Sequence, residues 1–181
     1  MKHGQSASRA MNAFDRIFSI LDHFRPIGAG KVRPHVEIEE REPGARQAAA
    51  LVMRERKGRR EILLITSRDT GRWIVPKGWI EDDEDGATAA EREAWEEAGV
   101  ISTAIGKSLG SYEYLKLRPK NGDIVCNVDV HLMQLEEERG RWPERKQRKR
   151  KWVHLSEALT SIEEPGLVDL LRTTRLFSAA A

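Results

Sequence analysis

The chain has 181 residues, one cysteine and a formal net charge of +2. This length suffices for one domain with its own core and an appendage. A single cysteine excludes an internal disulfide framework and favours a reducing compartment. No apolar run approaches the roughly 18 residues of a membrane span and no signal peptide opens the chain, so we expect a cytoplasmic protein without membrane contact.

Residues 1–44 are expected to be an N-terminal extension. Between Arg9 and Arg25, apolar residues recur at helical spacing, and a segment with proline and glycine follows. This pattern predicts an amphipathic helix with a flexible link after it. We expect the helix to dock on the domain, with a homodimer interface or a poorly ordered extension as the alternatives. Asp15 and Asp22 interrupt its basic face, which argues against a transit peptide.

Two apolar segments, residues 47–53 and 61–66, flank a charged segment at 54–60. This arrangement predicts a β-hairpin joined by a charged turn. The next segment, residues 72–78, reads Arg-Trp-Ile-Val-Pro-Lys-Gly. It predicts a short strand that ends where Pro76 restricts the backbone.

Residues 87–98 contain no glycine or proline and consist largely of strong helix formers. They predict a helix that stops at Gly99. At about 100° per residue, alanines fall on one stripe and glutamates gather on the adjoining arc. These are Ala87, Ala90, Ala94 and Ala98, and Glu93, Glu96 and Glu97. The small alanines allow close packing on a sheet, which places the glutamates at the edge of the packed seam.

Downstream, residues 109–117 and 124–135 alternate apolar with polar side chains around an Asn-Gly pair, which predicts a second hairpin. A brief strand is expected at 151–153. A helical region follows from Ser156, with an interruption near Pro165.

The predicted elements combine into one domain over residues 45–177, followed by a tail at 178–181. They indicate an α/β (α+β) architecture in which a mixed β-sheet is sandwiched between helices. No separate DNA-binding domain fits in the remaining chain.

The glutamates of the predicted helix favour a bound cation. Carboxylates three and four residues apart repel one another on a helix, and a divalent metal relieves that repulsion. Magnesium is commonly held by one or two carboxylates together with substrate phosphates. A solvated acidic face is the ordinary alternative, and the surrounding residues decide against it. They run from Gly78 through Glu84 and Arg92 to Gly99 and Val100.

This spacing resembles the Nudix box at every fixed position of that motif, so the chain resembles the Nudix hydrolase superfamily. The resemblance implies the Nudix fold, with a loop-helix-loop catalytic box. It also implies magnesium-dependent hydrolysis of a phosphoanhydride bond, with manganese as a possible substitute metal.

Under this resemblance, the catalytic residues are Glu93, Arg92, Glu96 and Glu84. The implied metal ligands are Glu93, Glu97, Glu96 and the carbonyl of Gly78. Arg92 matches an arginine that orients a glutamate, and Glu84 matches a supporting glutamate. The identity of the base among the three helix glutamates stays open.

Residues 72–78 and the basic segment before Trp152 resemble the diphosphoinositol polyphosphate and diadenosine polyphosphate phosphohydrolases. The resemblance covers roughly residues 45–160 and implies a small-molecule polyphosphate substrate. Trp79 departs from that group, which commonly has a second glycine there. Nucleotide sugars and an RNA 5′ end carry the same kind of anhydride, so they stay open as substrates.

Four basic residues are expected to hold the substrate phosphates, because guanidinium and ammonium groups suit phosphate oxygens. They are Arg68, Arg72, Lys77 and Arg148. For the basic run at 145–151, a solvated loop or a non-specific nucleic-acid patch is the alternative. The corresponding alternative function is a catalytically silent Nudix-fold module that binds or regulates nucleotides or RNA. The presence of every box glutamate favours catalysis.

Overall fold

The computed structural model describes residues 45–117, 122–174 and 176. The helix expected within residues 1–44 and the tail at 178–181 lie outside these described residues, and so does most of the turn expected in the second hairpin. These expectations stay predictions.

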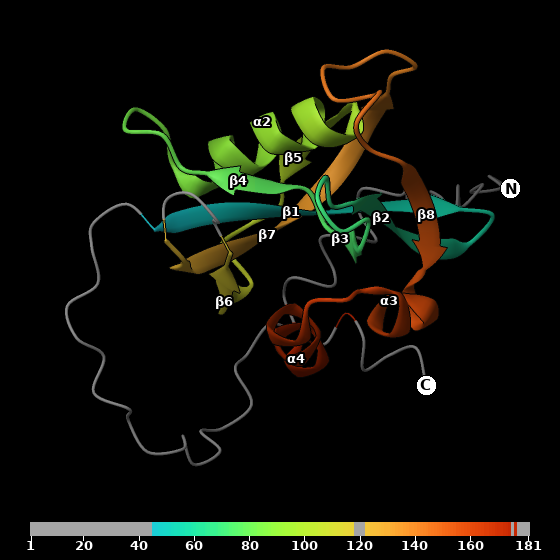
Figure 1. Ribbon diagram of the computed structural model, residues 1–181. Helices are drawn as coiled ribbons and strands as arrows, with labels where there is room; N and C mark the ends of the chain where they lie inside the picture. Colours follow the sequence, from blue (N-terminus) through green and yellow to red (C-terminus); the bar gives the residue numbers. More distant parts are fainter. Residues whose placement is uncertain (1–44, 118–121, 175, 177–181) are drawn as a thin grey trace, which may run out of the picture. The chain divides into compact units, whose positions relative to one another are not determined.

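The described strands belong to one mixed sheet (Figure 1). In chain order they are β1 (Arg46–Arg56), β2 (Arg59–Thr66), β3 (Trp73–Ile74), β4 (Lys77–Trp79), β5 (Val100–Ala104), β6 (Gly110–Lys116), β7 (Ile124–Glu138) and β8 (Arg150–His154). The sheet order is β3-β2-β1-β7-β5, while β4 pairs with β1, β6 with β7 and β8 with β2. Strands β1 and β7 are parallel, and the other pairs are antiparallel.

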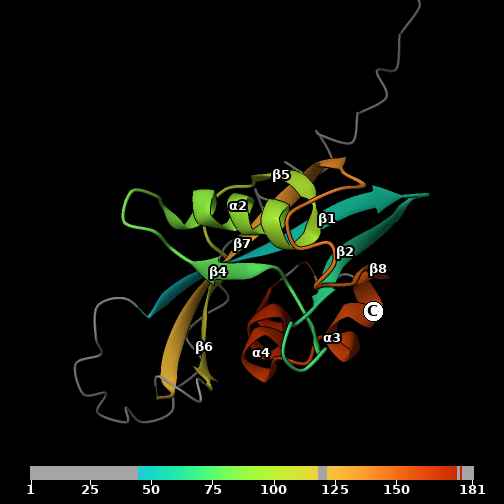
Figure 2. The ribbon, with the colours of Figure 1, turned by 45° about the horizontal axis from the view of Figure 1, so that its top comes forward.

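Helices lie on both faces of this sheet. They are α2 (Gly86–Ala98), α3 (Leu155–Ser161) and α4 (Pro165–Thr173). Helix α2 covers one face, and α3 and α4 lie on the opposite side (Figures 1 and 2). This arrangement confirms the predicted sheet between helices. Among the described helices, none combines the length and apolar character needed to cross a membrane.

The first hairpin has a shorter turn than expected. Strand β1 continues to Arg56 and β2 begins at Arg59, so the expected charged turn at 54–60 is wrong. Lys57 and Gly58 make the turn with positive φ angles of 52° and 73°, a combination that suits a two-residue hairpin connection. The charged side chains extend the hairpin instead of ending it, because Arg54 pairs across the strands with Glu61 at 2.7 Å.

Helix α2 has the limits that the sequence predicts to within one residue. The Asp85 side chain caps its start by accepting a hydrogen bond from the Thr88 backbone N–H at 2.8 Å. Gly99 ends it with a left-handed φ of 66°, and its N–H donates to the carbonyls of Ala94 and Trp95. These two contacts satisfy backbone groups that a helix leaves unpaired at its ends.

The alanine stripe of α2 forms the seam with the sheet. Ala89, Ala90, Ala94 and Ala98 are fully buried, whereas Ala87 of the predicted stripe is only partly buried. They pack in one core with residues of β1 and β2, including Ala48, Ala50, Val52, Leu63 and Ile65. Alanines on both α2 and β1 allow the helix to pack closely on β1. Because β4 pairs with β1, the helix then lies beside β4.

One strand differs from the sequence expectation. Strand β5 was not predicted; it follows directly after Gly99 and alternates buried with exposed residues against β7. The predicted interruption near Pro165 is confirmed, because α3 ends at Ser161 and Pro165 opens α4. Proline is favoured in the first turn, where its missing N–H leaves no hydrogen bond unmade.

Candidate active site

The carboxylates of Glu93 and Glu97 lie side by side between α2 and β4. They are one helical turn apart, and the residues are 8% and 6% exposed. Any side chain at Gly78 on β4 would overlap the Glu93 carboxylate. The backbone N–H of Lys77 donates to Glu97 Oε2 at 3.0 Å. Strand β4 therefore meets both glutamates, and glycine at position 78 makes that approach possible.

Glu96 lies apart from this pair. Its side chain is 43% exposed, and its Oε2 lies 3.7 Å from Nη1 of Arg92. Neighbouring residues on a helix point about 100° apart, which turns Glu96 outward from the buried pair. Of the three predicted helix glutamates, the structure brings two together and links the third through Arg92.

Arg92 joins the box loop to the helix. Its Nη2 donates to Glu84 Oε1 at 2.6 Å and to the Trp79 carbonyl at 2.8 Å. Its Nη1 donates to Glu93 Oε1 at 2.7 Å. The hydrogen bond from Arg92 holds the pKa of Glu84 below its usual value. Arg92 thus contacts both Glu84 and Glu93, the residues that it is expected to link, and their catalytic roles stay predictions.

Burial dominates the electrostatics of the glutamate pair. It raises the pKa of Glu93, although the hydrogen bond from Arg92 opposes this. It also raises the pKa of Glu97 to about 7, against the charge of Arg148 and the Lys77 N–H. Both carboxyl groups are therefore shifted in the direction that a nearby cation would reverse.

The oxygen donors at this place fit a hard divalent cation. Glu93 and Glu97 are the carboxylates best placed for it, and Glu96 lies at the rim. Gly78, the remaining expected ligand, lies on β4 directly against the Glu93 carboxylate. Among the described residues, no three His, Cys, Asp or Glu side chains enclose a metal position by themselves. Magnesium commonly uses one or two carboxylates and completes its shell with water and substrate phosphates. The donor set is of that open kind.

The four predicted phosphate ligands do not meet at one place: Arg68 and Arg148 contact Glu144, whereas Lys77 contacts Glu164. Arg68 is half-exposed and pairs with Glu144 at 3.2 Å, while Arg72 is exposed. The other two differ from the expectation, because each is buried in an ion pair. Lys77 Nζ lies 2.5 Å from Glu164 Oε1, and Arg148 donates to Glu97 and Glu144.

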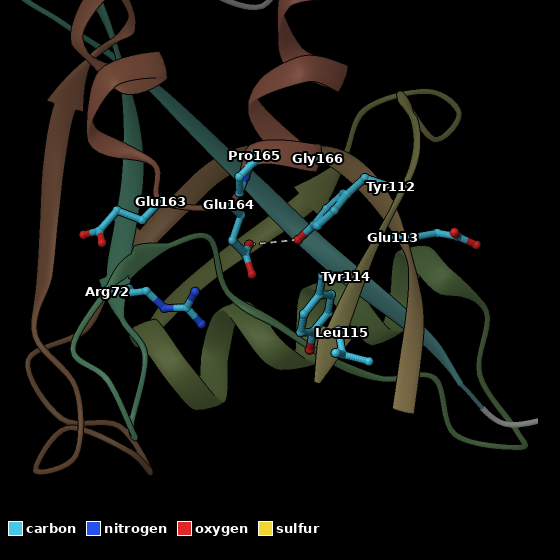
Figure 3. Close-up of a pocket in the computed structure, with 9 residues that line it drawn as sticks. All are labelled: Arg72, Tyr112, Glu113, Tyr114, Leu115, Glu163, Glu164, Pro165 and Gly166. Carbon is cyan, nitrogen blue, oxygen red and sulfur yellow. Dashed lines mark hydrogen bonds between the residues drawn. The ribbon is translucent and has the colours of Figure 1, made fainter. Parts of the chain in front are cut away.

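A pocket of about 290 Å³ lies between β6 and the start of α4 (Figure 3). Its lining residues are Arg72, Tyr112, Glu113, Tyr114, Leu115, Glu163, Glu164, Pro165 and Gly166. The Tyr112 hydroxyl donates to Glu164 Oε2 at 2.9 Å. Figure 3 shows Arg72 reaching toward Glu164 and Tyr114, whereas Glu113 and Glu163 point away from the centre.

Lys77 connects this pocket with the glutamate pair. Its side chain pairs with Glu164 in the pocket wall, and its backbone N–H holds Glu97. The Lys77 ammonium also lies 5.0 Å from the centroid of the Tyr114 ring. Lys77 therefore contacts the pocket through its side chain and a candidate metal ligand through its backbone.

Glu144, Glu164 and Tyr112 are contact residues of the site that the sequence interpretation missed. Glu144 directly precedes the basic run at 145–151. A single carboxylate next to several cations was the signal that could have indicated an ion pair there. Glu164 and Tyr112 carried no comparable pattern. Their role depends on contacts between segments that are distant in the sequence.

The chain matches the model of the NUDIX domain over residues 44–173. It is 35% identical over 115 residues to "Nudix hydrolase 16, mitochondrial" of Arabidopsis thaliana, covering 61% of this chain and 63% of that protein. It is 32% identical over 120 residues to "Diphosphoinositol polyphosphate phosphohydrolase 3-beta" of Bos taurus, covering 65% and 69%. The crystal structure of the C. elegans Ap4A hydrolase is similar with a TM-score of 0.53 and 25% identity, covering 74% of this chain and 96% of that one. The chain spans about half to just under two thirds of the length of three Arabidopsis thaliana relatives that it matches.

Proposed function

The chain belongs to the NUDIX domain family, and on this premise we propose that it is a magnesium-dependent hydrolase that cleaves a phosphoanhydride bond in a polyphosphate substrate. The observation that carries the proposal is the meeting of β4 with the buried Glu93 and Glu97. A solvated acidic helix face would leave these carboxylates exposed. Here they are buried against β4, which supports a role as metal ligands.

We infer the role of each site residue from its contacts. Glu93 and Glu97 hold the cation together with the Gly78 carbonyl and Glu96, and Arg92 fixes Glu93 with support from Glu84. When bound, magnesium neutralises phosphate oxygens and lowers the pKa of water. Manganese is the proposed substitute. A glutamate of the box accepts the proton from the attacking water.

The substrate proposed is a diadenosine polyphosphate or a diphosphoinositol polyphosphate. The pocket beside Lys77 supports a ring-bearing group next to the scissile anhydride, because Tyr114 offers an aromatic ring and Leu115 an exposed apolar side chain. Among the described residues that line it, Arg72 is the only cation. A heavily phosphorylated inositol needs several cations around it. This charge distribution therefore favours the dinucleoside substrate.

A silent binding module that uses the basic run at 145–151 receives less support. Arg148 is buried against carboxylates. Arg150 donates to the Ala98 carbonyl at 2.6 Å and pairs with Glu138 at 2.8 Å. These arginines serve internal contacts, which leaves a smaller basic surface for nucleic acid.

The test is magnesium-dependent product release from a panel of substrates. The panel holds diadenosine polyphosphates, a diphosphoinositol phosphate, triphosphorylated RNA and nucleotide sugars. We expect selective turnover of the first two. Glu97→Gln should lower kcat about 10²–10⁴-fold, because it removes a proposed metal ligand and candidate base while keeping the shape of the side chain.

The matched control is Asp83→Asn, which removes an exposed carboxylate from the loop that precedes α2. This variant should keep the kcat of the unchanged protein. Full activity of Glu97→Gln would show that Glu97 is not an essential metal ligand, and the proposed metal site would be wrong. An absence of turnover across the panel, with either magnesium or manganese, would instead support the binding module.

A further inference from the structure

The segment between β7 and β8 is fastened to the C-terminal end of α2. The backbone N–H of Glu144 donates to the Glu96 carbonyl at 3.0 Å, and that of Arg139 donates to the Gly99 carbonyl at 2.8 Å. Trp142 lies so close to Gly99 that an added Cβ there would come within 2.6 Å of the indole ring. These contacts occupy carbonyls that a helix leaves unpaired at its end. The segment is thereby held against the box.

Arg148 extends from this segment into the interior, where its side chain is 5% exposed. Its Nη1 donates to the Thr66 carbonyl at 3.0 Å, and its Nε donates to Glu144 Oε2 at 2.5 Å. Its Nη2 donates to Glu97 Oε1. Three nitrogens thus hold three acceptors from β2, the segment and α2. A guanidinium fork suits such fixed, divergent contacts better than an ammonium does.

Glu97 is therefore held from two sides. Arg148 binds one carboxylate oxygen, and the Lys77 N–H binds the other. The charges of Glu93 and Glu144 both act on Glu97. Without Arg148, Glu97 would lose one of its two contacts and the cation that offsets its burial, so the carboxyl group would no longer be fixed in its place beside β4.

We propose that Arg148 is a positioning residue for Glu97, with Glu144 as the anchor of its guanidinium, and that it is not a ligand of the substrate phosphates. The expected effect on turnover rests on the proposed function. The expected orientation of the Glu97 carboxylate does not, and it can be tested without an activity assay.

The first test measures amide hydrogen exchange in Arg148→Met. We expect exchange at the Lys77 amide to rise at least about tenfold, because its acceptor, Glu97 Oε2, moves away. The neighbouring Ala50 amide, which donates to the Pro76 carbonyl at 2.9 Å, serves as the internal reference and should keep its rate. Arg145→Met is the matched control, since Arg145 is an exposed arginine of the same run. An unchanged Lys77 amide in a folded Arg148→Met would overturn the proposal, whatever the enzyme activity.

The second test separates the two roles by kinetics on the substrate that the panel identifies. A positioning role predicts that Arg148→Lys and Glu144→Gln each lower kcat about tenfold or more while KM stays within about twofold. A phosphate ligand predicts the opposite pattern, in which Arg148→Lys raises KM. Glu144→Gln would then leave kcat unchanged, because it frees the guanidinium for substrate. Both variants keep side chains of similar size, which guards against a loss of fold.

Discussion

At the scale of single residues, Gly78 has the strictest requirement in the site. It sits on β4 where the Glu93 carboxylate occupies the space that a side chain would need. The requirement comes from the close approach of backbone and carboxylate. Gly78 does not have a left-handed backbone conformation of the kind found at Gly99.

We expect Gly78→Ala to lower kcat about 100-fold while the protein stays folded, because a displacement of about 1 Å at a catalytic group is costly. The added methyl group must push Glu93 away from β4. Steady-state kinetics together with circular dichroism measure the effect. Gly140→Ala is the control, since an added Cβ at Gly140 meets no atom within 4 Å. Wild-type kinetics in Gly78→Ala would mean that Glu93 does not act in the position seen.

At the scale of elements, the N-terminal end of α2 lies over His131 of β7. A Cβ added at Gly86 would come within 2.8 Å of His131 Nε2. Within the described part of the chain, this buried nitrogen has no hydrogen-bond partner. Burial lowers the pKa of His131, although the charges of Asp129 and Asp85 oppose the change. The helix dipole also disfavours a cation at this end.

His131 should make the protein less stable in mild acid. Since its folded-state pKa lies below its unfolded value of 6.5, the folded protein binds this proton less readily. The stability contribution is therefore complete above that value and is lost as the pH falls through the folded-state pKa. We expect the free energy of unfolding of the wild type to drop more than that of His131→Gln between about pH 7.5 and about pH 5. Urea denaturation at both pH values measures this, and equal drops would exclude His131 as the source.

At the scale of the whole described domain, Lys77 and Glu164 connect the two sides of the sheet. Glu164 immediately precedes α4, and Lys77 begins the strand that faces α2. Both side chains are 7% exposed, and Tyr112 also donates to Glu164. A buried ion pair becomes costly when one partner is removed, because the remaining charge is left uncompensated.

We expect Lys77→Met to lower the free energy of unfolding by about 3 kcal/mol, since Glu164 then loses its cation. Lys77→Met combined with Glu164→Gln should recover part of that loss, because no buried charge remains. Thermal and urea denaturation of both single variants and the double variant provide the cycle. Additive losses would show that the two side chains do not depend on each other.

Local spacing explains why the box was predictable. The limits of α2 follow from the helix formers between Asp85 and Gly99, whose capping contacts involve residues only a few positions away. Helical periodicity alone places Glu93 and Glu97 one turn apart on the same side of α2 and turns Glu96 toward the exposed rim. The first hairpin was predictable for the same reason, although its turn was placed too widely.

The sequence alone determined the family, the alternation of sheet and helices, and the residue types at the candidate metal site. These features depend on patterns among residues that are close together in the sequence. The tertiary structure decided which charges meet. Lys77 pairs with Glu164 across 87 positions and Arg148 with Glu97 across 51. A basic run in a sequence has the same composition whether its side chains face solvent or the interior. Only the tertiary packing selects their partners, because it brings Glu164 at the start of α4 to β4 and the segment before β8 to α2. This packing withdraws Lys77 and Arg148 from the surface.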